Sequence, residues 1–117
     1  MKMFVPAPGD LIRLTRHWKF SLHKEYRNSD LFEVFDPQHL FCDPLHVTLP
    51  AGTVLKVERI YIKGAYPDYN SVTFRTMASP DGRLANRKNG GTGKSRRFWA
   101  KLPDVNLIEF EHVEELA

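Results

Sequence analysis

The chain has 117 residues with 17 Lys and Arg, 14 Asp and Glu, and a net charge of +3. This length suits a single domain, and the apolar and aromatic content excludes a wholly disordered chain. A single Cys excludes an intrachain disulfide framework and favours a reducing, cytoplasmic location. No apolar run approaches the roughly 18 residues of a membrane span, and the first eight residues lack the apolar stretch of a signal peptide. We therefore expect no membrane partner.

Positive charge is concentrated in the body of the chain and negative charge at its end. Residues 1–101 hold all 17 basic residues, whereas residues 102–117 hold five acidic residues and no basic one. A basic surface favours a polyanionic partner, because binding releases the counterions that surround the polyanion. We interpret residues 109–117 as an acidic C-terminal tail that keeps the protein soluble or pairs with its own basic surface.

Alternation of apolar and polar residues with a period of two predicts half-buried strands along most of the chain. Residues 12–22 alternate in this way, and Arg16 interrupts the apolar positions, which indicates a bend or a break. Residues 24–52 are less regular but rich in apolar side chains, so we expect a long, ordered excursion. Within it, Asp30 and Glu33 have the spacing of a helix capping box.

The clearest strand covers residues 53–63. Leu55 and Val57 share one parity, whereas Ile60 has the other. This change of phase near Glu58 indicates a β-bulge, and bulged, bent strands are typical of small barrels.

Further strands and loops complete the predicted order. We expect a hairpin loop at residues 64–70, a strand at 71–77, a flexible basic loop at 83–96, a strand at 97–102, a turn at 103–106 and a last strand at 107–111. The loop at 83–96 contains a glycine-rich run without an apolar residue, which predicts flexibility.

The long first loop, the strand led by Gly52 and the one-turn break at 103–106 resemble the pattern of SH3-like small barrels. The resemblance covers about residues 9–111. It implies one mainly β domain, built as a five-stranded bent barrel with a long ordered first excursion. An OB-like barrel is the alternative, because it is also five-stranded and bent. The features with which SH3 domains bind proline-rich peptides are missing, so that activity is not implied.

No catalytic motif stands out in the chain. Residues 91–95 read Gly-Thr-Gly-Lys-Ser, but a phosphate-binding loop would need a glycine where Lys88 stands. It would also need a following helix, and a strand is predicted there instead. We expect neither an enzyme nor a bound cofactor.

Three residues of zinc-binding types lie close together at His39, Cys42 and His46. Their spacing matches no common zinc site, and a second Cys pair is absent from the sequence. We keep them as weak metal candidates and expect no metal.

The strongest functional signal combines basic and aromatic residues. The basic cluster comprises Arg83, Arg87, Lys88, Lys94, Arg96 and Arg97. On the following strand, Arg97, Trp99 and Lys101 share the parity opposite to the buried side, and this stripe suits nucleic acid because cations bind phosphates and rings stack on bases. Trp99 could instead be covered by the excursion. Tyr66 and Tyr69, at the hairpin tip, form a second candidate binding surface.

The leading hypothesis is therefore a small barrel that binds nucleic acid through the basic loop and this exposed strand. The alternative is a protein-interaction module, regulator or small inhibitor of the type that phages encode. Such a protein would bind an acidic protein partner through the same loops. An edge strand also leaves open the pairing of two copies into a homodimer.

Overall fold

The computed structural model describes residues 7–38, 44–65, 69–80, 82, 84 and 94–114, and it is mainly β. The strands are β1 (Leu11–Leu14), β2 (Trp18–Leu22), β3 (Leu45–Leu49), β4 (Val54–Tyr61), β5 (Ser71–Ala78), β6 (Arg97–Lys101) and β7 (Phe110–Val113). The helical segments are η1 (Tyr26–Asn28), α1 (Ser29–Phe35) and α2 (Leu102–Val105).

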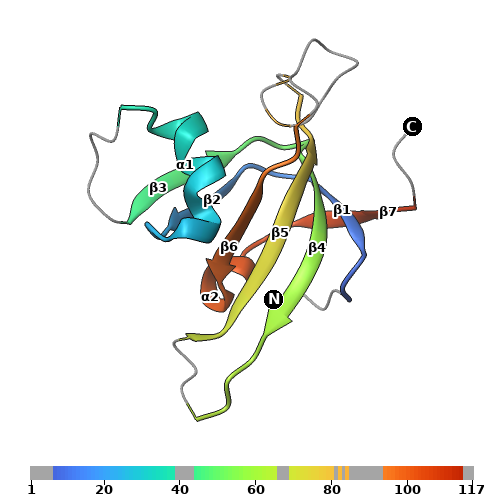
Figure 1. Ribbon diagram of the computed structural model, residues 1–117. Helices are drawn as coiled ribbons and strands as arrows, with labels where there is room; N and C mark the ends of the chain where they lie inside the picture. Colours follow the sequence, from blue (N-terminus) through green and yellow to red (C-terminus); the bar gives the residue numbers. More distant parts are fainter. Residues whose placement is uncertain are drawn as a thin grey trace.

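The described strands form two antiparallel sheets (Figure 1). The larger sheet has five strands in the order β6-β5-β4-β1-β7, and the smaller one pairs β2 with β3. Within the described ranges, no strand pairing joins the two sheets or closes the larger one. The mainly β class predicted from the sequence is confirmed in this form.

The predicted first strand is divided between the two sheets. β1 pairs with β4 and β7, whereas β2 pairs with β3, and the chain breaks near Arg16 as predicted. A turn at Gly52 brings β4 back beside β1, because the backbone N–H of Gly52 donates a 2.7 Å hydrogen bond to the carbonyl of Leu14. Gly52 has a φ of +93°, and a Cβ there would lie 2.9 Å from Cγ of Pro80. The turn therefore requires glycine.

β4 contains the bulge predicted near Glu58. Its register with β5 shifts between Val57 and Arg59. One extra residue inverts the alternation of side chains along a strand. Val57 is buried before the bulge, Ile60 packs against the core after it, and Arg59 and Tyr61 are exposed. The bulge thus determines which side chains in the second half of β4 face solvent.

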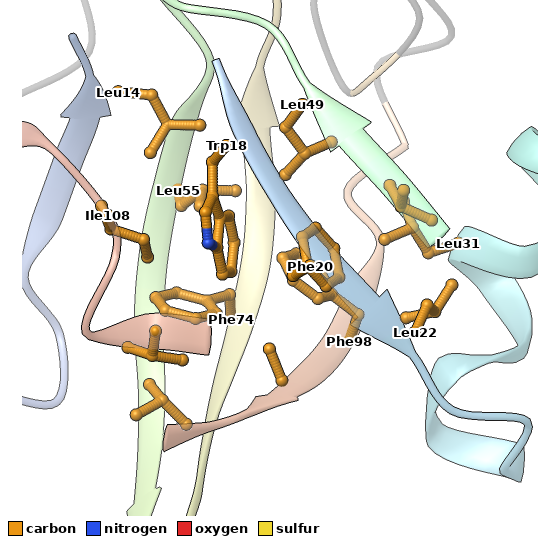
Figure 2. Packing of buried hydrophobic residues seen from close by; sticks show 14 of the residues in the cluster. Leu14, Trp18, Phe20, Leu22, Leu31, Leu49, Leu55, Phe74, Phe98 and Ile108 are labelled. Atoms are coloured by element: carbon orange, nitrogen blue, oxygen red, sulfur yellow. The ribbon is translucent and has the colours of Figure 1, made fainter. Parts of the chain in front are cut away.

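The hydrophobic core fills the space between the two sheets (Figure 2). Trp18 and Phe20 of β2 stack with ring centroids 4.2 Å apart, and Phe20 lies 5.3 Å from Phe98 of β6. Phe98 in turn stacks on Phe74 of β5 at 5.5 Å. The indole N–H of Trp18 donates a 2.9 Å hydrogen bond to the carbonyl of Asp104 in α2. One face of β5 and β6 therefore packs into the core.

The predicted excursion over residues 24–52 is ordered where it is described. It contains η1, α1 and β3, and β3 is a strand that the sequence analysis did not predict. Its buried apolar residues alternate with exposed polar ones. Residues 39–43 of the excursion lie outside the described residues.

The predicted capping box at Asp30 and Glu33 is wrong. Asp30 lies in the first turn of α1, and Asn28 at the N-cap forms no side-chain cap hydrogen bond. The buried amide of Asn28 instead accepts a hydrogen bond from the backbone N–H of Trp99 and donates one to the carbonyl of His23, both at 2.8 Å. The side chain at the N-cap of α1 therefore contacts β6 and does not cap the helix.

The C-terminal elements are shifted relative to the prediction. Residues 102–105 form α2, with Pro103 in its first turn, where the missing N–H is not needed. The last strand covers Phe110–Val113 rather than residues 107–111. None of the described helices has the length and apolar character needed to span a bilayer.

Candidate functional site

The solvent-facing side of β4, β5 and β6 aligns nine residues in three rows. The strand register forms the rows Tyr61–Ser71–Lys101, Arg59–Thr73–Trp99 and Lys56–Arg75–Arg97. We call these nine residues the outer face. Figure 1 shows the three strands side by side, and the residues that alternate with the outer face point into the core.

Five of the nine outer-face residues are cationic, and one of the five is paired with a carboxylate. Arg75 Nε donates a 2.5 Å hydrogen bond to Glu58, the bulge residue. The other four are Lys56, Arg59, Arg97 and Lys101, and no carboxylate in the described part of the chain forms an ion pair with them. The outer face therefore carries positive charge that favours an anionic ligand.

A hollow of about 450 Å³ opens on this surface. Its described lining includes three aromatic residues, Tyr61, Tyr69 and Trp99, and four cationic ones, Arg27, Arg59, Lys63 and Lys101. Tyr61 and Tyr69 are 40% and 65% exposed, so their rings are accessible to a ligand. We call this the first hollow.

A second hollow, of about 420 Å³, adjoins the first and shares Arg27, Arg59 and Thr73 with it. Lys56 and Arg97 add further positive charge. Its lining also includes Glu58, which Arg75 holds. Of the described residues that line this second hollow, none is aromatic.

The segment before η1 and η1 itself hold Trp99 at the edge of the first hollow. The Trp99 ring stacks on His23 with centroids 5.3 Å apart and planes inclined by 4°. The indole N–H donates a hydrogen bond to the carboxylate of Glu25. Arg27 Nε donates to the same carboxylate at 3.0 Å. The half-buried indole is thus fixed in orientation and not sealed into the core.

The Glu25 carboxyl at this contact has a lowered pKa. Burial by itself raises the pKa of this group, but the hydrogen bonds from the Trp99 indole and from Arg27 outweigh burial. Ionised Glu25 therefore holds two residues that line the first hollow, Trp99 and Arg27.

The structure brings together part of the predicted binding set. Arg97, Trp99 and Lys101 lie on the outer face, as their parity predicts, and Tyr69 lines the first hollow. Arg96 does not face the same way, because its guanidinium is half-buried and donates a 3.1 Å hydrogen bond to the carbonyl of Asp30 in α1.

The remaining predicted residues lie in or near the basic loop and the hairpin tip. Lys94 is exposed at the start of the last described segment. Arg83, Arg87, Lys88 and Tyr66 lie outside the described residues, as does most of the predicted loop 83–96. The nine residues of the outer face do not include any of them.

Sequence reasoning missed the contribution of β4 and η1. The bulge near Glu58 was predicted, and its consequence is that Arg59 and Tyr61 join the face of Arg97 and Trp99. That signal was present in the sequence. Arg27 lines both hollows although it lies far from β6 along the chain, and no local pattern indicates its position.

Two carboxylates of the predicted acidic tail are engaged elsewhere. Glu111 pairs with Arg13 of β1 at 2.8 Å, and Glu109 pairs with Arg16 at 3.0 Å. These contacts correspond to the interpretation that the tail pairs with the protein's own basic side chains. They involve arginines outside the outer face.

No described contact brings the weak metal candidates His39, Cys42 and His46 together. His39 and Cys42 lie outside the described residues, and His46 is exposed on β3, where its Nδ1 lies 3.5 Å from Ser21 Oγ. Within the described ranges, no group of three His, Cys, Asp or Glu side chains is arranged to bind a metal.

No protein-family model, curated protein or solved structure matches this chain. The function must therefore be inferred from the outer face and its two hollows.

Proposed function

We propose that the protein binds nucleic acid on the outer face of β4, β5 and β6. The observation that carries this proposal is the three-row arrangement of cationic and aromatic residues, continuous with two adjoining hollows. Four of its cations have no carboxylate partner among the described residues. A phosphate backbone would supply the missing negative charge and release its counterions on binding.

The aromatic residues favour nucleic acid over a generic anion. A patch that only neutralises charge needs no rings, whereas a base offers a π-face to Tyr61, Tyr69 or Trp99. Binding rather than catalysis fits the lining, because Glu58 is the only carboxylate among the described lining residues of the two hollows and Arg75 already engages it. We place this activity in the cytoplasm, on the basis of the single Cys.

The test is the salt dependence of binding, measured by fluorescence anisotropy with labelled oligonucleotides. The logarithm of the affinity should fall linearly with the logarithm of salt concentration. The double substitution Lys56→Ala with Arg97→Ala should weaken binding several-fold. It should also reduce the slope by about 0.7 for each single-strand phosphate contact that is lost.

Arg13→Ala with Arg16→Ala is the matched control, because it also removes two positive charges, from side chains that are 45% and 79% exposed and pair with Glu111 and Glu109 away from the outer face. It should leave the affinity nearly unchanged. Polyglutamate serves as an anion without bases and as a mimic of an acidic protein. If polyglutamate competes as well as an oligonucleotide of equal charge, the partner is an acidic polypeptide and the proposal is wrong.

We also propose that the domain belongs among the SH3-like small barrels. The β4–β5–β6 meander, the position of β1 between β4 and β7, and the one-turn α2 before the last strand support this proposal. Of these features, only α2 corresponds to one on which the sequence resemblance rests, the one-turn break at 103–106. NMR contacts between the backbones of the two sheets would test whether they close into one bent barrel.

A further inference from the structure

We infer that the outer face selects an unpaired strand, with a base in the first hollow and backbone phosphates in the second. This inference rests on the proposed function and specifies the form of nucleic acid that is bound. Its basis is that aromatic residues line the first of the two adjoining hollows, whereas no described lining residue of the second is aromatic.

The first hollow is suited to a base. Three aromatic residues, Tyr61, Tyr69 and Trp99, line it together with Ser71 and Thr73. In a duplex the base faces are covered by neighbouring base pairs, whereas in a single strand they are free to stack on protein rings. A ligand that uses these rings must therefore be unpaired at this point.

The second hollow is suited to phosphates. Lys56, Arg59 and Arg97 line it, and no described lining residue there is aromatic. The carboxylate of Glu58 lines it too, but the 2.5 Å hydrogen bond to Arg75 engages that group. Phosphate contacts of this type position a strand without reading its sequence.

The spacing of the rows is compatible with one short strand crossing both hollows. From Ser71 to Arg75 the three rows span four residue-to-residue steps along β5, which is about 13 Å at the usual rise of a strand. Arg59 and Thr73 lie on the boundary because they line both hollows. The ligand therefore passes directly from a hollow lined by both rings and cations to one whose described lining has cations and no ring. The site is a short one, at the lower end of the roughly 4–16 nucleotides bound by an OB-fold.

The rings are held before the ligand arrives. Trp99 is fixed between its stack on His23 and its hydrogen bond to Glu25. The guanidinium of Arg59 lies 5.7 Å from the centroid of the Tyr61 ring, within the range of a cation–π contact. Preorganised side chains lose less entropy on binding, so each ring contributes more of its stacking to the affinity.

The experiment compares three labelled probes of equal length: a single strand, the corresponding duplex and a single strand without bases. Each is prepared with deoxyribose and with ribose, and the sugar that binds more tightly is used. We expect the order single strand, then abasic strand or duplex, with a difference of about tenfold or more. Tyr61→Ala should reduce binding of the single strand to nearly that of the abasic strand, whereas Tyr61→Phe should retain the preference.

His112→Ala is the ring control, because His112 is exposed on β7 and lines neither of the two hollows. It should leave the preference in place. Equal affinity for all three probes, with Tyr61→Ala without effect, overturns this inference. If Lys56→Ala with Arg97→Ala still weakens binding in that case, the proposed function stands. If no probe binds in a salt-dependent way, the proposed function fails as well.

Discussion

The indole N–H of Trp99 and the carboxylate of Glu25 form a hydrogen bond that joins β6 to the segment before η1. Glu25 also accepts a hydrogen bond from Arg27, so one carboxylate orients both an aromatic and a cationic residue of the first hollow. The two residues are 74 positions apart in the chain. The edge of the candidate site therefore depends on long-range packing.

The Glu25 contact predicts a specific pH dependence of stability. The folded-state pKa of Glu25 lies below its ordinary value of 4.5, so the ionised contact stabilises the fold above that pH. This contribution is lost as the pH falls through the lower folded-state pKa. Urea unfolding of wild type and Glu25→Gln should differ most above pH 4.5, and the difference should shrink toward lower pH. A difference that grows on acidification would contradict the assignment.

Replacement of Asn28 should be costly for stability. Asn28→Ala removes the acceptor for the Trp99 N–H and the donor for the His23 carbonyl at a fully buried position. Each buried group left without a partner costs about 1–3 kcal/mol, so we expect a loss of about 2–4 kcal/mol in the free energy of unfolding. The exposed neighbour Ser29 provides the control. A loss for Asn28→Ala no larger than for Ser29→Ala would show that the amide does not hold β6.

Removal of the bulge carboxylate should strengthen the proposed binding. Glu58→Gln removes the charge that engages Arg75, so that a fifth cation of the outer face becomes available to phosphates. We expect affinity for a single strand to rise several-fold at low salt and the salt slope to steepen by about 0.7. Glu111→Gln makes the same change of net charge next to Arg13 and should have little effect. Equal gains for both variants would indicate a response to net charge alone.

Gly9 and Gly52 have similar φ angles, so substituting each by Ala compares the energetic cost of backbone strain alone with the cost of strain plus steric overlap. Gly52 and Gly9 have φ values of +93° and +96°, which disfavour any side chain. A Cβ at Gly52 would also meet Cγ of Pro80 at 2.9 Å, whereas a Cβ at Gly9 would have no neighbour within 4 Å. Gly9→Ala should cost about 1–2 kcal/mol in thermal or urea unfolding, and Gly52→Ala should cost more. Equal costs would mean that Pro80 moves aside without penalty.

Local alternation predicted the main strands and the inward residues well. Burial of Phe98 and Ala100 and exposure of Arg97 follow from a period of two, and the bulge at Glu58 follows from the break in that period. These features are local, because strand pleating relates each side chain to its immediate neighbours in the chain. The same rule applied to residues 45–49 would have identified β3.

Long-range contacts account for what the sequence pattern did not predict. Arg96 belongs to the basic cluster by sequence, but the packing of α1 against β6 directs its guanidinium to Asp30. Asn28 has the position of a helix cap, but β6 uses its amide. Arg27 reaches both hollows only because η1 lies beside β6. A single sequence contains no pairing information for such contacts.

The bulge at Glu58 has an evolutionary consequence. Because the extra residue sets the phase of the second half of β4, an insertion or deletion between Val54 and Tyr61 would exchange the surface and interior sides of that half. Arg59 and Tyr61 would turn inward and Ile60 outward, so ligand contacts and packing would fail together. Among descendants of this gene, we expect changes of length to accumulate in the hairpin at residues 62–70, while the number of residues in β4 stays constant.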